Sequence, residues 1–330
     1  MKKSNFFWTE NKHLETEVSS YFSLLEEYNQ KEFNGDVSIL LLGSLSRGEG
    51  SWKTINGVDT IVSDIEFFTQ LPTNFSKYDR LNQIFEIAQQ KCFPDQTSSL
   101  FHIDKGIGGI DMSGMERKLI TYDANVFAYT VVGKDYKHTM PIVTYQNINM
   151  QDIWEVLIHR IFSALYWGKP LKEAGKLEEY RYNIAKNSLD LMIVVLVNHH
   201  QLVSGFSNRL EAIRHLDIRE DFKNYFEYCL SIIFSLPCQH TYSIEEMENL
   251  FITILEQQSQ DFRFCFRNYC CNIKHIVRRY LGQAKRALKY KHIPSTQIKH
   301  LHNMINLFKS DKNISQEVIA DNIVLNGYPI

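Results

Sequence analysis

Apolar and polar positions in the first part of the chain follow both helical and strand periods. Residues 14–30 carry apolar side chains at helical spacing and predict a helix. Residues 37–42 form a continuous apolar run that is too short for a helix, so they predict a buried strand. The remaining elements predicted here are a strand at 63–71, a helix at 77–91, and strands rich in β-branched and aromatic residues at 99–104 and 118–133.

The pattern changes after about residue 148. From there apolar residues recur at helical spacing almost to the end of the sequence, and glycine and proline are scarce. The predicted helices are 151–167, 177–203, 208–235, 243–258, 262–291, 296–308 and 314–323. We therefore expect an α+β fold in two domains, with a mixed sheet and flanking helices in residues 1–148 and an all-helical domain in residues 149–330.

Charge and composition exclude several classes of protein. The chain has 36 Lys and Arg against 38 Asp and Glu, so its net charge recruits neither nucleic acid nor a membrane surface. The longest apolar run, 191–197, is far shorter than a membrane span, and no secretory leader is recognisable at the start. The six cysteines contain no CxxC pair and predict free thiols. These features predict a cytoplasmic protein.

One short segment combines features that suit phosphate and metal binding. The predicted strand at 37–42 runs into Gly43–Gly50 ("GSLSRGEG"), which we call the hook. Gly43 permits a close turn, Ser44 offers a hydroxyl and a backbone N–H, and a helix starting there would attract phosphate at its N-terminus. The next strand projects Asp64 and Glu66 to one side, where two repelling carboxylates favour a divalent cation. Together these features favour phosphorus-group transfer from a nucleoside triphosphate (NTP).

The hook and the paired acids, "GSLSRGEGSW…SDIEFF", resemble the signature of the polymerase-β-like nucleotidyltransferase superfamily. Its members include aminoglycoside nucleotidyltransferases and poly(A) polymerases. The resemblance implies that Gly43 and Ser44 hold the triphosphate and that Asp64 and Glu66 bind Mg²⁺. Family members usually supply a third carboxylate from a strand after the next helix, often as the general base. Three aspartates stay open for this role, in decreasing order of preference: Asp104, Asp123 and Asp111.

The sequence departs from the family pattern in two places. The stretch between Ser44 and Asp64 is longer than usual, which predicts an inserted loop at 53–60 with a turn at Asn56-Gly57. The second acid is Glu66, where most members have aspartate, and this favours an altered metal geometry.

Three further polar residues have two interpretations each. Arg47 is either a solvated loop cation or a contact to the triphosphate. Ser63 either starts the strand or is a polar neighbour of the metal. Lys186 is either a surface lysine or, as in related two-domain enzymes, a lysine of the helical domain that reaches the triphosphate.

The predicted activity is transfer of a nucleoside monophosphate, most simply AMP from ATP, to an acceptor hydroxyl with release of pyrophosphate. Two Mg²⁺ ions would be held by Asp64, Glu66 and Asp104, with Asp104 as base. A looser likeness to a bacterial group linked with polysaccharide gene clusters favours a small or saccharide acceptor. A basic stretch at 274–292 leaves an RNA acceptor open. The alternatives are a non-catalytic module that binds nucleotide or a partner, and an RNA-modifying toxin-type enzyme.

Overall fold

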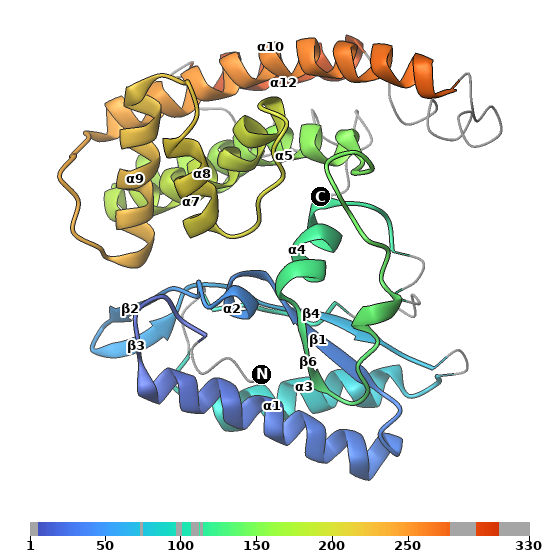
Figure 1. Cartoon of the computed structure of the whole chain (residues 1–330). Coiled ribbons are helices and arrows are strands. Elements are labelled where there is room, and N and C mark those ends of the chain that lie inside the picture. Colours follow the sequence, from blue (N-terminus) through green and yellow to red (C-terminus); the bar gives the residue numbers. More distant parts are fainter. Residues whose placement is uncertain are drawn as a thin grey trace. The chain divides into compact units, whose positions relative to one another are not determined.

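The first half of the chain forms α+β structure and the second half is helical (Figure 1). The computed structural model describes residues 6–72, 75–96, 101–106, 112, 115–277 and 295–309. Its contacts divide the chain into two compact units, Met1–Ile148 and Asn149–Ile330. The predictions for Asp111 and for a helix at 314–323 lie outside the described residues, as do the side chains of the basic stretch at 274–292.

The first unit contains a four-stranded mixed sheet in the order β5-β4-β1-β6 and a separate two-stranded sheet, β2-β3. Strand β1 is antiparallel to both β4 and β6, whereas β4 and β5 are parallel. The elements are α1 (Lys12–Phe33), β1 (Ser38–Leu42), α2 (Gly43–Arg47), β2 (Trp52–Ile55), β3 (Val58–Ile61), β4 (Ile65–Gln70), α3 (Tyr78–Cys92), β5 (Ile103–Asp104), α4 (Leu119–Phe127), β6 (Tyr129–Val132) and the short 3₁₀-helix η2 (Lys137–Thr139).

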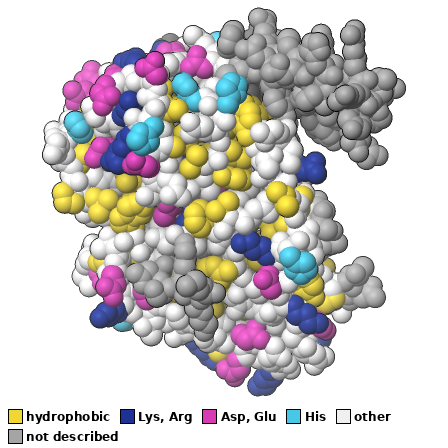
Figure 2. Space-filling model, in the orientation of Figure 1, with side chains coloured by type: hydrophobic (Ala, Val, Ile, Leu, Met, Phe, Trp, Pro, Cys, Tyr) yellow, Lys and Arg dark blue, Asp and Glu magenta, His cyan; other side chains and the backbone are white. Residues whose placement is uncertain are grey.

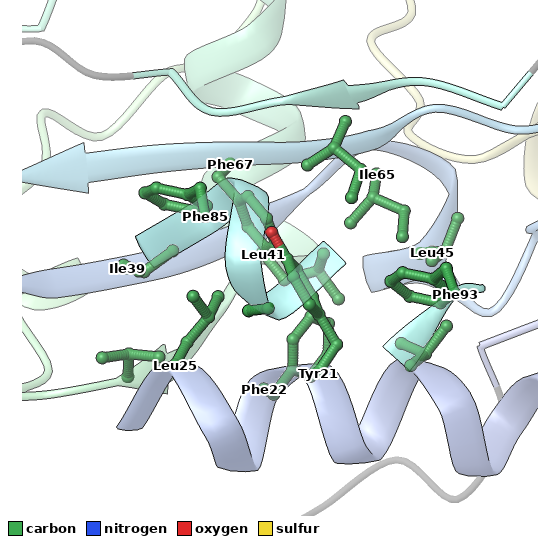
Figure 3. Packing of buried hydrophobic residues seen from close by; sticks show 14 of the residues in the cluster. Tyr21, Phe22, Leu25, Ile39, Leu41, Leu45, Ile65, Phe67, Phe85 and Phe93 are labelled. Carbon is green, nitrogen blue, oxygen red and sulfur yellow. The ribbon is translucent and has the colours of Figure 1, made fainter. Parts of the chain in front are cut away.

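Strand β1 is buried on both faces, which explains its unbroken apolar sequence. Ile39 and Leu41 pack with residues of α1 and α3, whereas Leu40 and Leu42 pack on the opposite face with residues of α4. Figure 3 shows the first of these layers, in which aromatic rings from α1, β4 and α3 fill the space between the helices and the sheet. The rings of Tyr21 and Phe67 are stacked there with centroids 6.2 Å apart. The hydrophobic layers thus fix β1 and β4 side by side.

The inserted segment is a β-hairpin. Strands β2 and β3 pair across Asn56 and Gly57, whose φ angles of 53° and 83° are both left-handed. Asn-Gly is the dipeptide that such a two-residue turn favours. The predicted turn is therefore confirmed, while the flanking residues form strands rather than an irregular loop.

The predicted strand at 118–133 is wrong in its first part. Residues Leu119–Phe127 form helix α4, and only Tyr129–Val132 form a strand. The β-branched and aromatic residues favoured a strand locally. In the structure, Thr121 and Ala124 lie one helical turn apart and are both buried, and Ala124 packs against β1. Strand β5 is also shorter than the predicted 99–104, spanning Ile103–Asp104 in the described residues.

The second unit is built around a helix, α7, whose second half is apolar on all sides. Every residue of 191–197 is buried in α7, as expected for a central helix. The Ser188 hydroxyl lies 2.9 Å from the Tyr225 hydroxyl, which also donates to the Met247 carbonyl, and these bonds join α7, α9 and α10. The elements are α5 (Met150–Ser163), the π-helix η3 (Ala164–Gly168), α6 (Lys169–Glu173), α7 (Leu177–Asn198), α8 (Phe206–Arg214), α9 (Glu220–Phe234), α10 (Ile244–Val277) and α12 (Ser295–Lys309).

Two helix predictions in this unit are corrected. The segment 208–235 contains two helices, α8 and α9, which each pack against α7 and against each other, an arrangement that one straight helix does not allow. Conversely, 243–258 and 262–291 are not separate, because α10 continues from Ile244 to Val277. No glycine or proline interrupts the chain between them.

Within the described part of the chain, no helix is long and apolar enough to cross a membrane. On the face drawn in Figure 2, acidic and basic side chains are interspersed, in keeping with the near-zero net charge.

Candidate active site

The hook leaves β1 through a turn that requires glycine and then forms a short helix. Gly43 has a φ of +66°, and α2 spans Gly43–Arg47. The Ser46 hydroxyl donates to the Gly43 carbonyl, and the Glu49 N–H donates to the Ser44 carbonyl. The hook therefore starts a helix, as its sequence predicts, and its loop is closed by its own hydrogen bonds.

The hook lies directly beside one of the paired acids, Glu66. Leu42 pairs with Glu66 across β1 and β4, so Gly43 begins beside this carboxylate. A Cβ atom placed on Gly43 would lie 2.7 Å from the Cδ and from the Oε2 of Glu66. Any side chain at this position would require the Glu66 carboxylate to move from where it lies. Gly43 is thus needed both for its backbone conformation and for the space that Glu66 occupies.

Glu66 lies on the face of the sheet that carries α4, and Asp64 comes two residues earlier, immediately before β4. Ile65 and Phe67, between and beyond them, are buried on the opposite face, while both acids are partly exposed. Asp104 of β5 pairs with Glu66 in the parallel register, so its side chain projects to the same face. Asp104 is exposed, and its Oδ1 accepts a hydrogen bond of 3.0 Å from the Gly106 N–H. The carboxylates of Glu66 and Asp104 thus share this face, and Asp64 lies just before β4.

Arg47 is neither solvated nor at the surface, which corrects one of its two interpretations. Its side chain is 8% exposed, and its Nε lies 2.7 Å from the Glu49 carboxylate. Its Nη1 lies 3.5 Å from the Asp123 carboxylate on α4. Burial acts to lower the pKa of the guanidinium, but three carboxylates raise it above its ordinary value. They belong to Asp123, Glu49 and Glu66.

Asp123 therefore lies on a helix and binds Arg47, rather than on the strand that the sequence predicted. Glu49 is the residue that sequence reasoning missed. It is buried, and it ties the end of the hook to Arg47. The signal for it was present in "RGEG", where an acid lies two residues from the arginine.

Ser63 joins the two ends of the hairpin. Its hydroxyl accepts the Ser51 N–H at 2.7 Å and lies 2.9 Å from the Ser51 hydroxyl. Its own N–H donates to the Ser51 carbonyl at 3.3 Å. These bonds join the segment that follows the hook to the segment that leads into β4. Lys186, the other residue with two interpretations, is half-buried on α7 in the second unit.

Asp64 and Glu66 suit Mg²⁺ binding as two carboxylate ligands rather than as members of a larger ligand group. Among the residues that the structure describes, no three His, Cys, Asp or Glu side chains form a group that could hold a metal ion, so Asp104 is not gathered with Asp64 and Glu66 into such a group. Mg²⁺ commonly takes one or two carboxylates and completes its shell with substrate phosphates and water. Glu66 on β4 and Asp64 immediately before this strand supply two such carboxylates.

Comparisons of the chain with protein-family models, with curated proteins and with solved structures find no match.

Proposed function

We propose that the chain is a nucleotidyltransferase with a polymerase-β-like first domain, which transfers a nucleoside monophosphate from an NTP, most simply ATP, to an acceptor hydroxyl. The observation that carries this proposal is the contact between Gly43 and the Glu66 carboxylate. It brings a glycine-serine turn at the start of a helix next to paired acids on a neighbouring strand. Phosphate and cation would then bind side by side, as NTP chemistry requires.

The polar groups of the candidate active site each have a defined role in this reaction. The backbone N–H groups at the start of the hook, at Gly43 and Ser44, would bind phosphate oxygens, and Asp64 and Glu66 would hold the Mg²⁺ ions. Bound Mg²⁺ supplies positive charge that stabilises the attacking and leaving oxygens. The acceptor oxygen bonds to the α-phosphorus, the bond to the β-phosphate breaks and pyrophosphate leaves. Asp104 accepts the proton of the acceptor hydroxyl.

Asp104 fits the role of base better than Asp123 does. Asp104 is exposed and lies in register with Glu66, so an acceptor can approach it from solvent. Asp123 is paired with the buried guanidinium of Arg47, so its carboxylate is already engaged by a side chain of the hook. We therefore assign Asp123 to holding Arg47.

Asp104→Asn is expected to lower turnover by about 10²-fold or more, because a general base is lost. NTP affinity should change little. Asp123→Asn should affect turnover less and lower the free energy of unfolding more, because it removes a partner of Arg47. Pyrophosphate release, NTP titration and chemical denaturation of both variants measure these effects. The reverse ranking of turnover would make Asp123 the base.

The contact between Gly43 and Glu66 has its own test. Alanine at Gly43 or at Gly57 puts a side chain at positive φ, +66° and +83°, but nothing lies within 4 Å of a Cβ at Gly57. Both variants should lose about 1 kcal/mol of stability from backbone strain. Only Gly43→Ala should displace Glu66 and reduce turnover, by about 10²-fold, as misplaced catalytic groups do. Equal activity of the two variants would contradict a role for this contact.

The acceptor is proposed to be a small molecule or a saccharide, on the strength of the family resemblance, with Lys186 of the helical domain as a further phosphate contact. An RNA acceptor bound through residues 274–292 is the weaker proposal. A non-catalytic binding module is favoured by one observation, since the Arg47 guanidinium binds Glu49 and Asp123 instead of being held open for a triphosphate. Mg²⁺-dependent release of pyrophosphate separates an enzyme from such a module.

A further inference from the structure

The segment before α1 is bonded to the end of the hook. The Gly50 N–H donates to the Phe6 carbonyl at 2.9 Å, and the Trp8 N–H donates to the Gly50 carbonyl at 2.9 Å. These two bonds form a parallel bridge between Phe7 and Gly50. Gly50, the last residue of the hook, is thereby held through both its N–H and its carbonyl.

One carboxylate holds this segment in place. Oε1 of Glu15, in the first turn of α1, accepts hydrogen bonds from the Phe6 N–H at 2.7 Å and from the Phe7 N–H at 3.2 Å. Glu15 is therefore linked to Gly50 through the backbone of two residues. Hydrogen bonds to a charged acceptor are stronger than those between neutral groups.

Packing supports the same arrangement. Phe6 and Phe7 are buried in one hydrophobic cluster with Leu45 of α2. A Cβ on Gly50 would lie 2.7 Å from the Phe6 carbonyl oxygen and 3.1 Å from the Cδ1 of Leu45. The segment thus packs with α2 as well as with the end of the hook.

The segment also reaches the hairpin that follows the hook. The Trp52 indole N–H donates to the Thr9 carbonyl at 3.0 Å, and the Asn11 side-chain amide donates to the Asp59 carboxylate at 2.8 Å. Residues 6–11 therefore bind the chain at the end of the hook and on both strands of the hairpin. The hydrogen bonds of Glu15 come at the start of this series of contacts.

We propose that Glu15 is a positioning residue for the hook, which holds residues 6–8 against Gly50 and so keeps Gly43 and Ser44 in the conformation that receives phosphate. Its effect on NTP binding rests on the proposed function. Its effect on the hook is a property of the fold and is measured without turnover. Glu15 touches no reacting group, and acts only through the backbone of Phe6 and Phe7.

Three variants test this role. Glu15→Ala removes the acceptor, Glu15→Gln keeps an oxygen at the same place, and Glu10→Ala removes an exposed acid of the same region as the control. Glu15→Ala is expected to speed amide hydrogen exchange at residues 44–50 by about tenfold, because charge-assisted hydrogen bonds are lost. Glu15→Gln keeps a neutral acceptor in place of the charged one, so its exchange rate should lie between those of Glu15→Ala and the parent chain. Glu10→Ala should stay within about twofold of the parent chain, since it leaves the acceptor intact.

In NTP turnover, Glu15→Ala should raise KM by about tenfold and change kcat little, because the hook binds substrate without reacting. Faster exchange throughout the chain, or unchanged exchange at 44–50, would overturn the positioning role. If the parent chain releases no pyrophosphate, the proposed function is contradicted. The exchange data then still test the positioning role of Glu15.

Discussion

Replacement of Asp64 by asparagine is expected to reduce Mg²⁺-dependent NTP turnover by about 10³-fold or more, because one of the two cation-binding carboxylates is lost. Stability should change by less than about 1 kcal/mol, since the substitution also removes repulsion between Asp64 and Glu66. Asp64 is partly exposed immediately before β4 and is not a member of the hydrophobic cluster, so the core is left intact. Pyrophosphate release and thermal unfolding measure the two effects.

The matched control for this variant is Asp36→Asn. Asp36 is an exposed aspartate that precedes β1 at the end away from the hook, and the substitution changes the net charge equally. Asp36→Asn should keep parental turnover. An Asp64→Asn chain that retains full activity, or one that fails to fold, would contradict the metal-binding role of Asp64.

Arg47→Met is expected to lower the free energy of unfolding by about 3–5 kcal/mol, the usual result of leaving a buried charge without its partner. Glu49 is 6% exposed and depends on the guanidinium at 2.7 Å. Asp123 loses the same partner on the side of α4. The side chain of methionine fills much of the space of the arginine stem, so the loss of charge dominates over the loss of packing. Chemical denaturation monitored by circular dichroism measures the difference.

A double variant separates the ion pair from other effects. Glu49→Gln in the Arg47→Met background removes the unpaired buried charge, so it should restore part of the lost stability. If the double variant is as unstable as the sum of the two single variants, Glu49 and Arg47 do not stabilise one another.

The local parts of the fold and site could be predicted from the sequence. The apolar run of β1 and the strand alternation around Ile65 indicated where the sheet lies, and the dipeptide Asn56-Gly57 indicated the hairpin turn. These signals depend on neighbouring residues, whose geometry is set by short-range sterics. The start of a helix at Gly43 was predicted for the same reason.

The contacts between distant segments could not be predicted. Helix α4 has strand-like composition, and its helical conformation is stabilised by packing of Ala124 against the sheet. The ion pair of Arg47 with Asp123 depends on that helix, so it was missed together with it. Likewise, no local pattern indicated that Glu15 would bind the backbone of Phe6 and Phe7.

Transfer of label from NTP tests the central claim most directly. The chain would be incubated with Mg²⁺, a cell extract and each of the four ribonucleoside triphosphates labelled at the α-phosphorus, in parallel with the Asp64→Asn variant. We expect an acceptor to gain α-label with one of the nucleotides, an equal amount of pyrophosphate to be released, and neither product to form with the variant. No label transfer with any nucleotide, or equal labelling by the Asp64→Asn variant, would contradict a nucleotidyltransferase site at the hook and the paired acids.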